Sequence, residues 1–166
     1  MKKAPSLDRL LDDLGYAADP ECRDTAARFA EVLREYAPSG PPPKLDTFPA
    51  PGRDRVMFRA LPFYSLCAHH LLPFFGEAEV AYVPGAWGRI AGLGGVARGL
   101  RHLSRQPQLQ ERLGAQFADY LHAELGGPVG VRLSARQMCM EMRGAESPGR
   151  VETLALRGGA TEDLLR

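Results

Sequence analysis

Apolar side chains recur at helical spacing in four stretches of the chain. Residues 7–14 place leucines on one face of a helix, and Gly15 follows as a stop signal. The last of the four carries an apolar stripe that includes Leu113 and Phe117, and Gly126 lies just beyond it. The spacing thus predicts a short first helix and three further helices, over residues of about 20–36, 93–104 and 108–125.

Other stretches alternate polar and apolar residues, as a strand with one buried face does. Residues 56–61 are strand-like, residues 77–83 and 129–142 alternate, and residues 151–156 end the series. Strands, then two helices, then strands is an α+β order. We therefore expect an antiparallel sheet with two helices on one face.

A proline-rich segment separates the first helices from the rest. Residues 39–43 read Ser-Gly-Pro-Pro-Pro, which is typical of a stiff, extended connector. The sequence therefore predicts an N-terminal helical appendage with its linker over residues 1–45. The main body is expected over residues 46–166.

Composition narrows the class of protein. The chain has 166 residues, of which 45% are hydrophobic and 25% charged, as in ordinary globular domains. A net charge of +1 gives no overall field to recruit nucleic acid or an anionic membrane. No apolar run approaches the ~18–20 residues that span a bilayer. We expect a cytoplasmic protein without nucleic-acid or membrane partners.

Cysteine and histidine form one candidate metal site. Cys67 and His70 are separated by two residues, a spacing that lets both side chains reach one ion, and thiolate with imidazole suits zinc. Cys139 is available as a third ligand, and on a strand it would share a face with Gln137. Three protein ligands leave a position for water. From spacing alone, Cys139 could equally be a core residue, and Cys22 is best explained as one.

Whole phrases of the sequence resemble the GTP cyclohydrolase I family, in its order and at its spacing. The resemblance covers roughly residues 20–145. It is carried by Asp24-Thr25-Ala26-Ala27-Arg28, Cys67-Ala68-His69-His70-Leu71-Leu72-Pro73-Phe74, Val80-Ala81-Tyr82-Val83-Pro84, Gly92-Leu93, Ala97-Arg98, Pro107-Gln108-Leu109-Gln110-Glu111-Arg112-Leu113, Met138-Cys139-Met140 and Arg143-Gly144.

The resemblance implies the tunnelling fold, assembled as a homo-oligomeric ring that is usually a decamer with active sites at subunit interfaces. The implied reaction opens the imidazole ring of GTP at C8, expels formate and recloses to dihydroneopterin triphosphate. The implied cofactor is Zn²⁺.

Each implied role falls on a residue of this chain. By position, Cys67, His70 and Cys139 match the zinc ligands, and His69 matches a histidine that moves protons. The carboxylate that reads the guanine edge matches Glu111, with Gln110 beside it. The arginines around the triphosphate match Arg28, Arg98 and Arg143.

Four positions depart from the family pattern. The family's glutamate after the first cysteine is Ala68, and its histidine two residues before the last ligand is Gln137, which has no usable pKa for proton transfer. A phosphate-binding serine and lysine are replaced by Gly94 and Gly95, and a second lysine is replaced by Glu31. No lysine follows Lys44 in the chain. The resemblance therefore implies fewer cationic side chains around the phosphates than the family pattern provides.

These departures leave three hypotheses. The first is the full GTP cyclohydrolase I reaction. The second is a diverged paralogue that hydrolyses a different or less phosphorylated purine-like substrate, or stops at the formamide stage. The third is a non-catalytic ring subunit that binds a pterin or purine, against which the retained zinc ligands argue.

Overall fold

The computed structural model describes residues 6–37 and 40–166, and the chain divides into two units, residues 1–37 and 38–166. The first unit contains the helix α1 (Leu7–Asp13), two 3₁₀ turns, η1 (Tyr16–Ala18) and η2 (Pro20–Cys22), and the helix α2 (Thr25–Glu35). Ser6 caps α1 by accepting a hydrogen bond from the backbone N–H of Arg9.

The helix predicted over residues 20–36 is split in the structure. Asp19 accepts from the backbone N–H of Glu21 at 3.0 Å and so caps the isolated turn η2. The backbone at Asp24 has φ −108° and ψ 12°, and the continuous helix begins only after it.

The second unit is built on a five-stranded sheet in the order β5-β2-β3-β6-β7. Its bounds are β2 (Val56–Cys67), β3 (Pro73–Tyr82), β6 (Val129–Gln137), β7 (Val151–Arg157) and β5 (Pro107–Gln108). All neighbours are antiparallel except β2 and β5. A separate pair joins β1 (Thr47–Pro49) to β4 (Arg89–Ala91), and the turn η3 (Glu162–Leu165) ends the chain.

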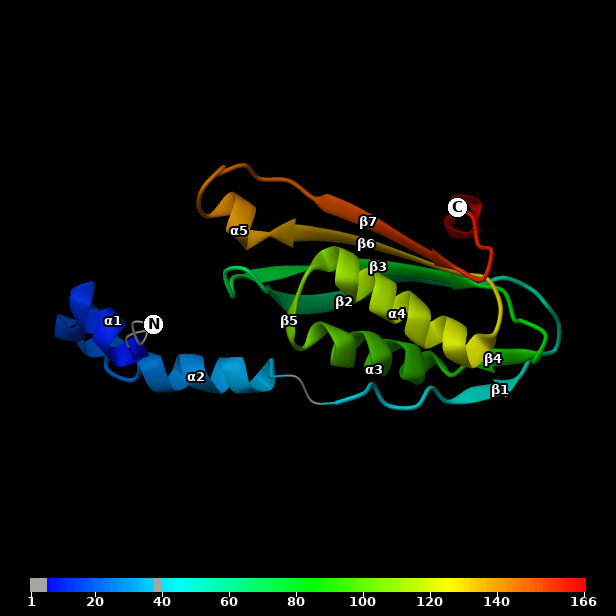
Figure 1. The fold of residues 1–166 in the computed structure, drawn as a ribbon, viewed down its shortest axis with the longest axis horizontal. Helices are drawn as coiled ribbons and strands as arrows, with labels where there is room; N and C mark the ends of the chain where they lie inside the picture. The colour runs from blue at the N-terminus through cyan, green and yellow to red at the C-terminus, as the bar shows by residue number, and fades with distance from the viewer. Residues whose placement is uncertain (1–5, 38–39) are drawn as a thin grey trace, which may run out of the picture. The chain divides into compact units, whose positions relative to one another are not determined.

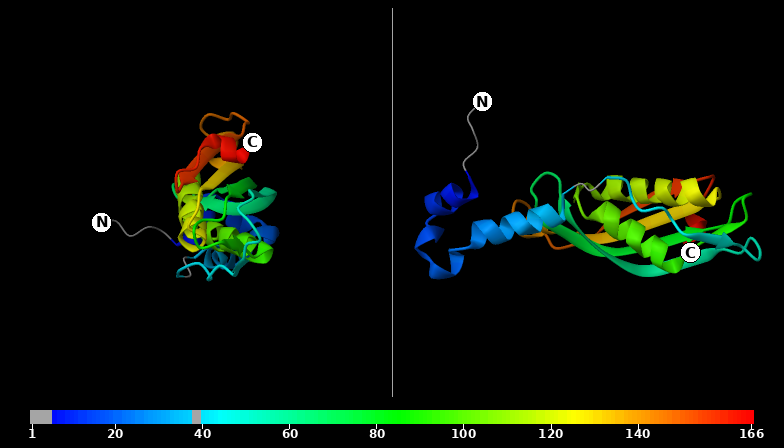
Figure 2. Two further views of the ribbon diagram at one scale, coloured as in Figure 1. Left: turned by 90° about the vertical axis from the view of Figure 1, so that its right-hand side faces the viewer. Right: turned by 90° about the horizontal axis from the view of Figure 1, so that it is seen from below.

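Two helices, α3 (Leu93–Ser104) and α4 (Gln110–Leu125), lie side by side on one face of this sheet, as Figures 1 and 2 show. The predicted α+β class with two helices on one face is therefore confirmed. Within the described ranges, no helix has the length and apolar character that crossing a bilayer requires.

The core forms between the apolar stripes of these helices and the inner face of the sheet. Alternate residues of β6 and the i, i+4 stripe of α4 are fully buried against each other: Val129, Val131, Leu133, Ala135, Leu113, Phe117, Leu121 and Leu125. Leu45, which the sequence analysis assigns to the connector, is also buried in this core.

The strand expected to run from residue 129 to 142 ends early, and this corrects the sequence analysis. The last pairing partner of β6 on β3 is Phe74, opposite Gln137. The next residue of β3 is Pro73, which has no N–H to donate. Beyond Gln137 the chain therefore folds into the one-turn helix α5 (Met138–Glu141), and Cys139 lies on this turn.

Gly76 marks a close approach of the two central strands, and we expect its replacement to destabilise the fold. A Cβ atom at Gly76 would lie 2.0 Å from the carbonyl oxygen of Ser134 and 2.7 Å from Cα of Ala135. Because both neighbours are backbone atoms in paired strands, Gly76→Ala should lower the free energy of unfolding by about 3 kcal/mol, the upper end of the usual cost of overpacking. Chemical denaturation measures the change.

The matched control is Gly114→Ala, in the middle of α4. There the nearest atom to an added Cβ is Cδ1 of Leu133, at 3.5 Å. The alanine should be neutral or stabilising by up to about 1 kcal/mol, because glycine is a poor helix former. Equal stabilities of the two variants would contradict the close approach at Gly76.

Candidate metal centre

Cys67 ends β2 at a tight turn that returns the chain to β3. The backbone N–H of Cys67 donates to the carbonyl of Leu72 at 2.8 Å, and its own carbonyl accepts from His70 and Leu71. Leu71 adopts φ +55°, in the left-handed region that non-glycine residues rarely occupy. The turn therefore holds Cys67 and His70 on the same short loop.

The short strand β5 holds this turn in place through backbone pairing. Cys67 pairs with Gln108, and the backbone N–H of Ala68 donates to the carbonyl of Gln108 at 2.9 Å. The buried side chain of Gln108 donates to the carbonyl of Leu103 and accepts from Arg112. The sequence analysis missed Gln108, because a buried glutamine cannot be told from an exposed one without its partners.

Three side chains converge at this place: Cys67, His70 and Cys139. Their candidate donor atoms all lie within 4.8 Å of one another, and Cys67 Sγ is 3.8 Å from His70 Nδ1. Cys67 is buried, Cys139 half-buried and His70 exposed, so one side of the group opens to solvent. In the described part of the chain this is the only such group of three or more.

The donor set fits a zinc ion. Zinc binds thiolate at about 2.3 Å and imidazole nitrogen at about 2.0–2.1 Å, so sulfur and nitrogen ligands of one tetrahedral ion lie roughly 3.6 Å apart. The 3.8 Å between Cys67 and His70 is close to that separation. Two sulfurs and one imidazole also favour zinc over magnesium or calcium, which prefer oxygen.

The electrostatics of the group without metal favour the neutral thiol of Cys139. Burial raises the pKa of the Cys139 thiol above its ordinary value, and the neighbouring Cys67 raises it further, while Arg143 lowers it. A thiolate at Cys67 would repel a second thiolate, which disfavours ionisation of Cys139. A divalent cation removes this penalty by binding both sulfurs as thiolates.

A pair of glutamines connects α4 to the cluster of Cys67, His70 and Cys139, which we call the metal-type group. Gln137, immediately before α5, donates from Nε2 to Oε1 of Gln110 at 2.6 Å. Gln110 is 3% exposed, and its own Nε2 donates to the carbonyls of Leu133 and Val151. The first residue of α4 is thus tied to β6, to β7 and to the residue that precedes α5.

The remaining candidate residues of this unit lie on the surface. His69 is exposed in the turn, with its ring centroid 6.1 Å from that of His70. Glu111 is exposed in the first turn of α4 and lines a cleft of about 340 Å³ between α4 and β7. Arg143 is exposed beyond α5, close enough to influence Cys139.

The structure does not bring Arg98 to the metal-type group through any hydrogen bond or ion pair of the described residues. Arg98 is exposed in the middle of α3 and pairs with Asp46 at 2.8 Å. In the N-terminal unit, Arg28 pairs with Asp24 at 3.5 Å on the exposed side of α2. The sequence analysis did not identify Asp46.

The positions that depart from the family pattern also divide between the two units. Ala68 is exposed in the turn beside His69, and the exposed Gly94 and buried Gly95 lie in the first turn of α3. Glu31 is exposed on α2.

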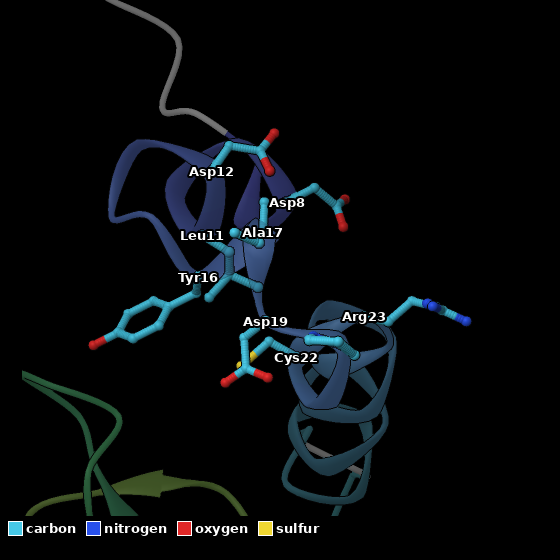
Figure 3. Close-up of a pocket in the computed structure, with 10 residues that line it drawn as sticks. Asp8, Leu11, Asp12, Tyr16, Ala17, Asp19, Cys22 and Arg23 are labelled. Carbon is cyan, nitrogen blue, oxygen red and sulfur yellow. The ribbon is translucent and has the colours of Figure 1, made fainter.

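A cavity of about 300 Å³ in the N-terminal unit is lined by several acidic residues and Cys22. Figure 3 shows the carboxylates of Asp8 and Asp12 pointing away from that of Asp19. The group therefore lacks the convergence that a cation site requires.

Comparisons with known proteins were consistent with one another. The family model for GTP cyclohydrolase I matches residues 4–164. GTP cyclohydrolase 1 of Corynebacterium glutamicum is 42% identical over 142 residues, covering 82% of this chain and 72% of the relative. GTP cyclohydrolase 1 of Streptococcus agalactiae is 37% identical over 169 residues, covering 98% of this chain and 89% of the relative.

A solved structure shows the same architecture. The apo form of an archaeosine synthase QueF-like protein superposes with a TM-score of 0.53 at 17% sequence identity, covering 66% of this chain and 99% of that one. At this identity the likeness concerns the fold alone. Together with the sheet order and the two helices on one face, it supports the expected tunnelling fold.

Proposed function

Because the chain belongs to the GTP cyclohydrolase I family, we propose that it catalyses the hydrolytic opening of the imidazole ring of GTP at C8. Formate is released, and the ring closes again to give dihydroneopterin triphosphate. One observation carries the proposal: within a chain that matches the family over nearly its whole length, two thiols and one imidazole converge at an open, zinc-compatible site.

We assign the metal to Cys67, His70 and Cys139. When bound there, zinc would supply a Lewis acid and lower the pKa of a water molecule toward neutrality. The chain itself supplies three donors and leaves the side of the exposed His70 accessible. Neutral imidazole and two ionised thiols are the forms that bind.

His69 is proposed to move protons at the imidazole ring of the purine. Its side chain is exposed beside His70, on a turn fixed by backbone hydrogen bonds, so it can reach a substrate at the open side of the site. Histidine suits this role because its ordinary pKa lies near neutrality.

Glu111 is proposed to hold the guanine base. A carboxylate can accept together from N1–H and the exocyclic amine of guanine, and these charge-assisted hydrogen bonds are worth about 1.5–3 kcal/mol. Glu111 is exposed at the start of α4, whereas the amide of Gln110 beside it already donates to backbone carbonyls. A substrate-binding role for Gln110 stays a prediction from the resemblance.

The arginines Arg28, Arg98 and Arg143 are proposed to contact the triphosphate, since guanidinium groups match phosphate oxygens.

We also propose that copies of the chain assemble into a homo-oligomeric ring, as a decamer, with active sites between subunits. The edge strand β7 supports this, because one side of its backbone has no strand partner among residues 6–37 and 40–166. A monomer mass in solution would contradict the assembly.

The decisive experiment incubates the zinc-loaded protein with GTP and measures formate and the absorbance spectrum of the product. We expect equal amounts of formate and a dihydropterin product, and loss of both after treatment with a chelator. Binding of GTP without formate would instead favour the non-catalytic ring subunit. A formamide product without free formate would favour the enzyme that stops early.

A further inference from the structure

The ion pair between Arg98 and Asp46 joins two segments that lie far apart in the sequence. Nη2 of Arg98, on α3, donates to Oδ2 of Asp46 at 2.8 Å, and Asp46 lies just before β1. The pair occupies the surface over the first turn of α3, where the family pattern has a serine and a lysine and this chain has Gly94 and Gly95.

The two glycines leave the space that this ion pair uses. A Cβ atom at Gly94 would lie 2.9 Å from Nη1 of Arg98. A Cβ atom at Gly95 would lie 3.0 Å from Cδ1 of Leu45 and 3.5 Å from the backbone nitrogen of Asp46. A side chain at position 94 would require the guanidinium of Arg98 to shift, and one at position 95 would require the Leu45 side chain to move slightly. The absence of a side chain at Gly94 therefore allows the position that the Arg98 guanidinium takes in this ion pair.

One further carboxylate, that of Glu124, lies near Tyr120, which contacts the segment before Asp46. The hydroxyl of Tyr120 donates to the carbonyl of Pro43 at 3.0 Å, just before the segment that carries Asp46. Burial raises the pKa of Tyr120, the carboxylates of Glu124 and Asp46 raise it further, and Arg98 lowers it. Arg98 is thus the positive member of a cluster that also contains two carboxylates.

Resting on the proposed function, we propose that Asp46 is a specificity-determining residue that competes with the substrate's phosphates for Arg98. The pair is exposed, with 59% of the Arg98 side chain and 64% of the Asp46 side chain accessible, so a phosphate group can displace the carboxylate. The displaced carboxylate stays nearby and repels the phosphates. Since a triphosphate carries more negative charge than a monophosphate, Asp46 penalises GTP most. The chain therefore discriminates weakly between guanine nucleotides of different phosphate number.

The test replaces Asp46 by its uncharged isostere. Asp46→Asn should lower KM for GTP by about 3- to 30-fold, the range expected for one partly solvated charge-assisted contact. It should change kcat less than twofold and KM for GMP less than KM for GTP. Inorganic triphosphate, measured by titration calorimetry, should bind this variant more tightly by a similar factor.

The matched control is Asp163→Asn. Asp163 is also exposed, at 74%, and pairs with an arginine at 2.8 Å, Arg166, far along the chain from α3. Asp163→Asn removes the same charge as Asp46→Asn. Equal changes in KM for GTP in both variants would therefore show a general charge effect and overturn the proposal. An unchanged KM for GTP in Asp46→Asn would overturn it as well.

A second variant reaches the same contact from the other side. Gly94→Ala adds a Cβ 2.9 Å from Nη1 of Arg98, so the guanidinium must shift from the position in which it pairs with Asp46, and alanine is well tolerated in a helix. It should also lower KM for GTP relative to GMP.

If the wild-type protein released no formate, the proposed function would fail. The binding of inorganic triphosphate would still decide whether Asp46 opposes anion binding.

Discussion

Replacing Cys139 by alanine is expected to abolish zinc retention and to lower formate release from GTP by more than about 100-fold. Mutations of residues that merely support a metal ligand typically cost 10–100-fold. Removing one of three direct ligands should cost more, because the two remaining donors, Cys67 and His70, hold the ion weakly. Zinc content measured by atomic emission, together with formate release, checks both parts of the prediction.

Cys22→Ala provides the matched control, because Cys22 is also a half-buried free cysteine but lies in the N-terminal unit outside the metal-type group. It should keep one zinc per chain and full activity. The fold of Cys139→Ala should persist, since position 139 is helical and alanine favours helix. Full zinc content and activity in that variant would remove the basis of the proposed function.

Replacing Gln137 by histidine is expected to raise kcat by at least about tenfold, since a positioned general acid or base typically contributes 10²–10⁴-fold. In the structure Gln137 is one residue from Met138 and two from Cys139, and its amide donates to Gln110. An imidazole N–H can donate to the same oxygen, so the variant adds a titratable group without removing the contact. The rate should also acquire a pH dependence near the ordinary histidine pKa.

Gln137→Leu separates this chemical effect from a structural one. It removes the hydrogen bond to Gln110 and adds no titratable group, so it should lower kcat or the melting temperature. A histidine variant that keeps its zinc but turns over no faster than the wild-type chain would show that proton transfer at this position does not limit the rate.

Gln137 and Asp46 are proposed to affect the reaction of this chain in two separate ways. Gln137 is proposed to affect the rate of the chemical step, because it lies two residues before Cys139, a proposed metal ligand. Asp46 is proposed to affect phosphate binding, because it faces Arg98 on α3. Measuring kcat and KM for both sets of variants therefore distinguishes the two effects.

Much of the fold follows from local patterns in the sequence. The stripe of apolar residues predicts α3 with the bounds that the structure shows, Leu93–Ser104. Alternation predicts β6 and β7, whose inward residues are indeed buried or half-buried. Such patterns are readable because each periodicity reflects the geometry of a single element. The proximity of Cys67 and His70 can also be predicted, because only two residues separate them in the sequence.

Tertiary structure decided the rest. Cys139 joins the group only because β6 pairs with β3 and because the pairing ends at Pro73, which turns the expected strand into α5. The contacts of Gln108 and Gln110 and the ion pair of Arg98 with Asp46 likewise depend on segments far apart in the sequence. Periodicity records which face of an element is buried, but only the packing of elements determines which polar groups meet there.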